Sequence, residues 1–112
     1  MQDLMNEQRT NLRLLDLAIS ELKTRGGNFA KCEHDYRVAL AKFIMAQRAE
    51  GIPVTIISDI SRGNPEIARK RMEKDIAESL YESCKEAINA YKLKIRVIDA
   101  QIEREWHSSG NK

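Results

Sequence analysis

Metal-ligand residue types occur together at one place in the chain, the run Cys32-Glu33-His34-Asp35. Thiolate, carboxylate and imidazole groups are the side chains that bind zinc and related ions. In a helix, however, consecutive residues point in different directions, and neighbours on one face stand three or four positions apart. The chain has 2 histidines, and the other, His107, lies near the C-terminal end. We therefore expect no metal site and no cofactor.

Nucleophilic chemistry has candidate residue types here but no recognisable motif. The residues that could supply parts of such a site are Ser58, Ser61, His34 and Cys84. The chain has no Gly-x-Ser-x-Gly elbow, Walker loop, His-Glu-x-x-His pair or paired-cysteine pattern. Both cysteines, Cys32 and Cys84, fall inside helical patterns, which is typical of buried thiols in a reduced cytosol. We expect a protein that is not an enzyme.

A basic cluster is the strongest indication of a binding site. It surrounds the expected start of a helix at Asn64-Pro65 and also includes Lys70. The candidate binding residues there are Arg62, Asn64, Arg69, Arg71 and Lys74. The first N–H groups of a helix have no intrahelical acceptor, and the helix dipole favours an anion such as phosphate. The alternative is a solvated face of salt bridges. That alternative rests on the interleaved acidic residues Asp59, Glu66, Glu73 and Asp75.

The composition indicates which elements hold these residues. Among 112 residues there are 5 glycines and 2 prolines, and 32% of residues are charged. This mixture suits a single domain, residues 1–112, built from long helices with solvated faces. The net charge of +2 gives little support to a nucleic-acid partner. No run approaches the roughly 18 apolar residues of a membrane span, and residues 1–10 lack a signal-peptide core. We expect a cytoplasmic protein without a membrane partner.

The first expected helix covers about residues 2–49. Its apolar positions recur at intervals of three and four residues, and the phase does not slip at Gly26-Gly27. This seam consists of Leu12, Leu15, Ile19, Leu22, Gly26, Phe29, Glu33, Tyr36, Leu40, Phe43 and Gln47, and it extends back to Met5 and Gln8. The unbroken phase favours one helix over the alternative of two helices separated at the glycines. Gly51 can take the left-handed conformation that ends a helix, and Pro53 follows it.

A short helix over about residues 53–62 is expected next, although its β-branched residues leave a strand as the alternative. Asn64-Pro65-Glu66 then carries a cap, a first-turn proline and a first-turn acid, so a third helix is expected over about residues 64–107. Residues 108–112 are expected to form a frayed tail. The seam of the third helix consists of Ala77, Tyr81, Cys84, Ile88, Tyr91, Ile95, Ile98 and Ile102.

Two long seams joined by a short connection predict an antiparallel helical hairpin. A fold-back about residue 57 predicts which residues face each other: Ile19 with Ile95, Leu12 with Ile102, and Gly26 with Ile88 and Tyr91. A glycine at position 26 would let a bulky side chain approach the backbone closely. Trp106 is expected to pack over Met5 and Gln8.

Apolar residues exceed these two seams. The extra apolar positions on the third helix are Ile76, Leu80, Ala87, Ala90, Leu93, Val97 and Ala100, and those on the first helix are Val38, Ala41 and Met45. A lone hairpin would leave them in water. The predicted fold is therefore an all-α, coiled-coil-like antiparallel hairpin. It has a short capping helix at the tip and forms a homo-oligomeric bundle, a dimer or larger.

Six short motifs also resemble a family of small proteins encoded by phages and prophages of Gram-positive bacteria. They are Glu33-x-Asp35-Tyr36-Arg37-x-Ala39-Leu40, Gly51-x-Pro53-Val54-Thr55, Ser58-Asp59-x-x-Arg62-Gly63, Asp75-x-Ala77-Glu78-x-x-Tyr81, Glu86-Ala87-Ile88-Asn89 and Gln101-Ile102-x-Arg104-Glu105-Trp106. The resemblance covers nearly the whole chain. It implies a phage gene product that acts in the cytoplasm of the bacterial host, and it brings no catalytic motif.

The leading expectation is a non-enzymatic phage accessory protein that works by binding. In a counter-defence role it would capture a host immune protein or a nucleotide signal, with an acidic protein surface or a phosphate at the basic cluster. A second expectation is nucleic-acid handling in phage replication, recombination or packaging. The third is a structural or assembly role.

Overall fold

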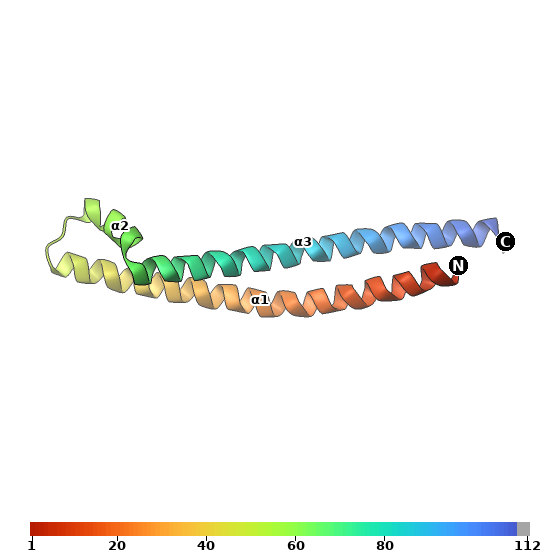
Figure 1. The fold of residues 1–112 in the computed structure, drawn as a ribbon, viewed down its shortest axis with the longest axis horizontal. Helices are drawn as coiled ribbons and strands as arrows, with labels where there is room; N and C mark the ends of the chain where they lie inside the picture. The colour runs from red at the N-terminus through yellow and green to blue at the C-terminus, as the bar shows by residue number, and fades with distance from the viewer. Residues whose placement is uncertain (110–112) are drawn as a thin grey trace. The chain divides into compact units, whose positions relative to one another are not determined.

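The computed structural model describes residues 1–109, which form three α-helices and no strand. They are α1 (Gln2–Ala49), α2 (Val54–Gly63) and α3 (Pro65–Ser108) (Figure 1). These bounds agree with the predicted ranges to within one residue at each end. Of the predicted tail, Ser108 ends α3 and Ser109 lies in a turn, while residues 110–112 lie outside the described residues.

Helix α1 passes through Gly26 and Gly27 without a break, so the alternative of two helices is wrong. Gly26 lies against the ring of Tyr81, and a Cβ atom added at Gly26 would stand 3.1 Å from Tyr81 Cε1. A Cβ atom at Gly27 would meet nothing within 4 Å. The expected close approach at Gly26 is therefore present, but Tyr81 makes it instead of Ile88 or Tyr91.

Gly51 ends α1 in the predicted left-handed conformation, with a φ of 81°. The N–H of Gly51 donates to the Arg48 carbonyl at 3.0 Å, and the N–H of Ile52 donates to the Gln47 carbonyl at 3.1 Å. This pair of bonds is a Schellman motif, which satisfies carbonyls that the last turn would otherwise leave open.

Asn64 caps α3 as predicted. Its Oδ1 accepts hydrogen bonds from the N–H groups of Glu66 and Ile67, both at 3.1 Å. The N–H of Ala68 donates to the Asn64 carbonyl at 2.9 Å. Because Pro65 has no N–H, every backbone donor from position 65 to position 68 is either absent or already satisfied.

Contacts within the chain gather into two compact units. The first unit joins Met1–Thr24 to the described part of Glu82–Lys112, and the second unit is Arg25–Tyr81. In each unit a stretch of α1 packs against a stretch of α3 that runs in the opposite direction. The fold is therefore the predicted all-α antiparallel hairpin.

The predicted α3 seam is confirmed along its whole length, since all eight positions are buried or half-buried. The predicted α1 seam is confirmed from Leu22 to Gln47. Nearer the N-terminus Gln8 is buried and Leu15 is half-buried, but the other predicted positions are wrong. Leu12 is 47% exposed and Ile19 is 40% exposed. The half-buried positions Ala18, Leu22 and Gly26 of α1 are separated by two successive steps of four residues. On a straight helix, positions that follow a strict seven-residue repeat gradually rotate around the helix axis. Two successive four-residue steps correct this rotation and keep the stripe facing α3.

Two polar residues, Gln8 and Asn11, are buried in the first unit. Gln8 belongs to the predicted seam, whereas Asn11 does not. Gln8 Nε2 donates to the Ile95 carbonyl at 2.8 Å and to Asp99 Oδ1 at 2.7 Å. Asn11 Nδ2 reaches Gln8 Oε1 at 3.5 Å. Burial of an amide is tolerated because it is hydrogen-bonded.

The predicted pairing of Ile19 with Ile95 and of Leu12 with Ile102 is also wrong. In the first unit the Cys84 thiol donates to the Ala18 carbonyl at 3.2 Å, in addition to the pairing of Gln8 with Asp99. The midpoints between the paired residue numbers lie near Gly51–Pro53, whereas the predicted fold-back was at residue 57. The physical reason is that α2 belongs to the returning half of the hairpin, so the chain reverses direction directly after α1.

The earlier reversal also explains the position of Trp106. The terminal ammonium group of Met1 pairs with Glu105 Oε2 at 3.2 Å, and Trp106 is 54% exposed. The predicted packing of Trp106 over Met5 and Gln8 is therefore wrong.

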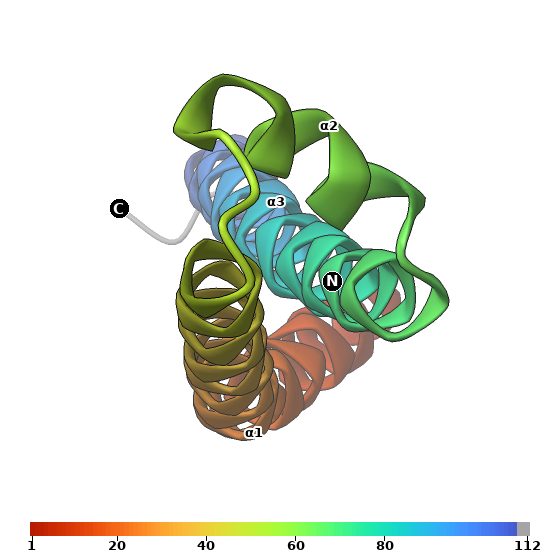
Figure 2. The same cartoon turned by 90° about the vertical axis from the view of Figure 1, so that its left-hand side faces the viewer.

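In the second unit, α2 crosses from the end of α1 to the start of α3 (Figure 2). Ile57 and Ser61 of α2 are buried, as are Ile67 and Ala77 of α3. Because the hairpin has few layers, the core is thin, and no described residue falls below 2% exposure.

Candidate functional site

The structure divides the predicted basic cluster into three environments. Arg62 and Arg71 line one cleft of the second unit, and Asn64 lines another. Arg69 and Lys74 line neither cleft, and each forms an ion pair with an acidic neighbour. The five residues therefore do not line one common cleft.

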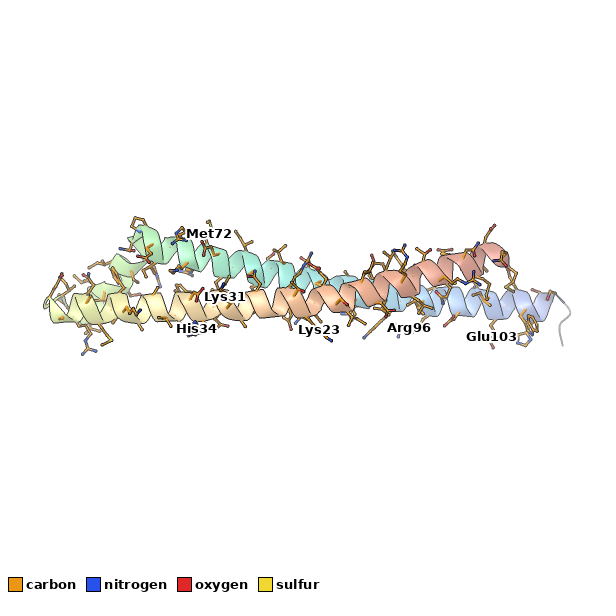
Figure 3. The ribbon with its side chains drawn as sticks, turned by 90° about the horizontal axis from the view of Figure 1, so that it is seen from below. Lys23, Lys31, His34, Met72, Arg96 and Glu103 are labelled. Carbon is orange, nitrogen blue, oxygen red and sulfur yellow. The ribbon has the colours of Figure 1, made fainter. Side chains whose placement is uncertain are left out.

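The first cleft, here called the arginine cleft, has a volume of about 420 Å³. All three helices contribute to it: Tyr36 from α1, Ser61 and Arg62 from α2, and Ile67, Ala68, Arg71, Met72, Asp75, Ile76 and Ser79 from α3. Its floor is apolar and accessible, since Met72 (labelled in Figure 3) is 55% exposed and Ile76 is 52% exposed.

Both guanidinium groups of the arginine cleft are uncommitted, since neither Arg62 nor Arg71 forms a hydrogen bond or ion pair with another described residue. The acid in the same cleft, Asp75, pairs with Lys74 at 3.2 Å. The Lys74 ammonium group also lies 5.4 Å from the centre of the Tyr36 ring. The cleft thus presents two free cations beside an apolar floor.

Arg69 is held away from this arrangement. Its Nη1 pairs with Glu73 Oε1 at 2.7 Å across one helical turn, and the Arg69 side chain is 54% exposed. Exposed pairs of this kind contribute about 0.3–0.5 kcal/mol. For Arg69, the alternative of a solvated salt bridge is therefore correct.

The second cleft, here called the lysine cleft, has a volume of about 470 Å³. It lies between α1 and the start of α3 and is lined by His34, Asp35, Val38, Ala39, Lys42, Phe43, Asn64, Glu66, Ile67 and Lys70. Asn64 contributes here as a cap, and the cap uses the backbone donors that the sequence reasoning had assigned to a phosphate. The prediction of free N–H groups at this helix start is therefore wrong.

The remaining candidate residues are separated or engaged. His34 Nδ1 lies 3.4 Å from Asp35 Oδ1, but within residues 1–109 no group of three histidine, cysteine or acidic residues is placed to hold a metal ion. The Ser61 hydroxyl donates to the Ser58 carbonyl at 2.7 Å. Cys84 is buried in the other unit, while Cys32 is half-buried. No helix within the described part of the chain carries an apolar stretch that could cross a membrane.

Comparison of the chain with protein-family models, curated proteins and solved structures finds no match in any of the three.

Sequence reasoning missed the residues that α1 contributes to the two clefts. Tyr36 joins the arginine cleft, and Lys42 joins the lysine cleft, from α1. Both contacts depend on the register of the hairpin, which the sequence misplaced. The signal for Ile76 was available, because it belonged to the extra apolar positions that a hairpin does not cover.

Proposed function

We propose that this chain is a non-enzymatic accessory protein that acts by binding an acidic segment of a partner protein in the arginine cleft. One observation carries this proposal: Arg62 and Arg71 are unpaired and stand beside the exposed apolar side chains of Met72 and Ile76. A cleft that combines free cations with accessible apolar surface matches the composition of protein interfaces, in which arginine and methionine are enriched.

An acidic protein segment fits the cleft better than a nucleotide does. Guanidinium groups bind carboxylates in a bidentate way, and the apolar floor would receive a leucine or similar side chain of the partner. A phosphate would need further donors, yet Asn64 already satisfies the backbone N–H groups of Glu66 and Ile67. The same argument gives little support to a nucleic-acid partner.

The proposed setting is the cytoplasm of a bacterial host, where the protein would serve a phage by counter-defence, through capture of a host immune protein. Support comes from the resemblance of the six motifs to phage and prophage proteins and from the lack of a catalytic motif. Capture requires only a binding surface, and the arginine cleft is the candidate for that surface.

The test is fluorescence anisotropy with a labelled amphipathic helical peptide that carries leucine on one face and glutamate at its edges. Arg62→Glu combined with Arg71→Glu should weaken binding by at least about tenfold, because the charges then repel. Arg69→Glu is the matched control, because Arg69 lies outside both clefts, and it should bind like the parent.

Three results would oppose the proposal. The double variant could bind the acidic peptide as tightly as the parent does, or the same peptide with lysine in place of glutamate could bind equally well. A nucleotide could instead raise the melting temperature while the peptide does not. Duplex DNA binding that falls steeply with salt would favour the nucleic-acid alternative.

A further inference from the structure

The stretch of α3 in the first unit carries a second apolar face, on the side away from its buried seam. The face recurs at three- and four-residue spacing and consists of Ala87, Ala90, Leu93, Val97 and Ala100. Leu93 is 55% exposed and Val97 is 50% exposed, while Ala87 is half-buried. Because the spacing matches that of the buried seam, the surface is shaped to receive another α-helix.

The two halves of this face differ in size and in charge. Its N-terminal half is small, with Ser83, Ala87 and Ala90, whereas Leu93 and Val97 make its C-terminal half bulky. Acidic residues border the small half at positions 82 and 86. Basic residues border the bulky half at positions 94 and 96.

We propose that this face is covered by the same face of a second copy of the chain, with the two α3 helices antiparallel about a two-fold axis near Ala90. In that arrangement Leu93 and Val97 meet the small residues Ser83 and Ala87 of the other copy. A two-fold axis makes each such contact occur twice. The alanines let the helices approach closely, so bulky and small residues fill one another's space.

The charges favour the same orientation. In the antiparallel pair, Glu82 and Glu86 of one copy stand opposite Lys94 and Arg96 of the other; Arg96 is labelled in Figure 3. Glu86 and Arg96 form no hydrogen bond or ion pair with other described residues, so both are available. Glu82 pairs with Lys85 at 3.2 Å within its own helix and would have to exchange that partner. In a parallel pair, each charged residue would instead face the same residue of the other copy, and the bulky residues would face one another. Like-charge repulsion and poor packing would then both weaken binding.

Light scattering after gel filtration tests the pairing, with twice the 12.9 kDa monomer mass expected. Leu93→Glu with Val97→Glu should raise the dimer dissociation constant by more than about tenfold, since it places charge in the centre of the contact. Leu12→Glu with Leu17→Glu is the matched control on α1, where both leucines are also exposed, and should leave the mass unchanged. Circular dichroism confirms that each variant is folded.

Cysteine cross-linking tests the orientation, in a Cys32→Ser background in which Cys84 is buried. Ala90→Cys lies near the two-fold axis and should form an intermolecular disulfide. Ala100→Cys should not, because antiparallel copies would hold the two thiols roughly 30 Å apart at 1.5 Å per residue.

Each alternative result overturns the pairing. A monomer at micromolar concentration would exclude it, and a dimer unaffected by the glutamates at 93 and 97 would place the contact on another face. Efficient cross-linking at both 90 and 100 would indicate parallel helices.

Charge reversal tests the ion pairs between the copies. Lys94→Glu with Arg96→Glu should weaken the dimer, and adding Glu82→Lys and Glu86→Lys should restore it. If the dimer is not restored, the charge pairing is rejected.

Discussion

Gly26 and Gly27 are neighbours in one helix, yet the structure predicts opposite responses to alanine. A Cβ atom at Gly26 would stand 3.1 Å from Tyr81 Cε1 and 3.5 Å from Tyr81 Cδ1. The Tyr81 ring also packs against the Phe29 ring, with ring centroids 6.0 Å apart, so any shift of Tyr81 disturbs that contact as well. A Cβ atom at Gly27 would point into open space.

Both substitutions gain helix propensity, but only Gly26→Ala brings a methyl group against Tyr81. Replacing glycine by alanine in a helix contributes about 1 kcal/mol, through helix propensity and a less flexible unfolded chain. Carbon atoms attract best at about 3.5–4.0 Å, so Gly26→Ala must displace the Tyr81 ring by a few tenths of an ångström. Overpacking costs about 1–3 kcal/mol, and the half-buried Tyr81 places it near the middle of that range. We expect Gly27→Ala to stabilise by about 1 kcal/mol and Gly26→Ala to destabilise by about 1 kcal/mol.

Thermal and urea unfolding, followed by circular dichroism at one protein concentration, measure the two variants side by side. Because the unfolded-state gain is common to both, the difference of about 2 kcal/mol isolates the contact with Tyr81. For a chain of this size the melting temperatures should differ by roughly 8 °C. If Gly26→Ala rises in stability as much as Gly27→Ala does, the close approach of Tyr81 imposes no constraint and the reasoning is refuted.

Three further substitutions, together with Gly63→Ala as a comparison, test the caps and the polar seam by urea unfolding. Asn64→Ala removes the acceptor for two N–H groups and should cost about 1 kcal/mol; an unchanged midpoint would mean that water replaces the cap. Gly51→Ala should cost about 1–2 kcal/mol because of the left-handed backbone at Gly51, whereas Gly63→Ala, with ordinary φ and open space around it, should cost nothing. Gln8→Ala removes the buried hydrogen bonds to Ile95 and Asp99 and should cost about 1–2 kcal/mol; a stability equal to the parent's would show that they add nothing.

The helix bounds could be predicted because local chemistry determines them. Gly51 and Asn64 act on backbone groups a few residues away, so their effects can be read without knowing the fold. The α3 seam was equally accessible, since isoleucines and tyrosines fill it at regular spacing. The N-terminal part of the α1 seam was only partly accessible: spacing placed Gln8 in it, but the hydrogen bonds of Gln8 and the burial of Asn11 depend on the packing of α1 against α3. A hydrogen bond between residues 8 and 95 exists only after the helices lie side by side.

In the candidate site, too, local features could be predicted, whereas features that depend on helix packing could not. Arg62 and Arg71 were among the predicted residues, and the structure places both in one cleft. Arg69 was predicted with them, although two residues along a helix turn the side chain to another face. Tyr36 could not have been assigned, since its place opposite α3 depends on the register. The cap at Asn64 was predicted, but the cap also uses the donors that a phosphate would require.

The thin core has a consequence for how stability changes with temperature. The heat-capacity change of unfolding follows the apolar surface that unfolding newly exposes. Large side chains such as Leu17 and Leu93 are more than half exposed in the folded chain, so unfolding adds little to their hydration. The free energy of unfolding should therefore change only gently with temperature, with little loss on cooling. If two copies pair, the apolar surface buried between them should increase the heat-capacity change and thus the curvature.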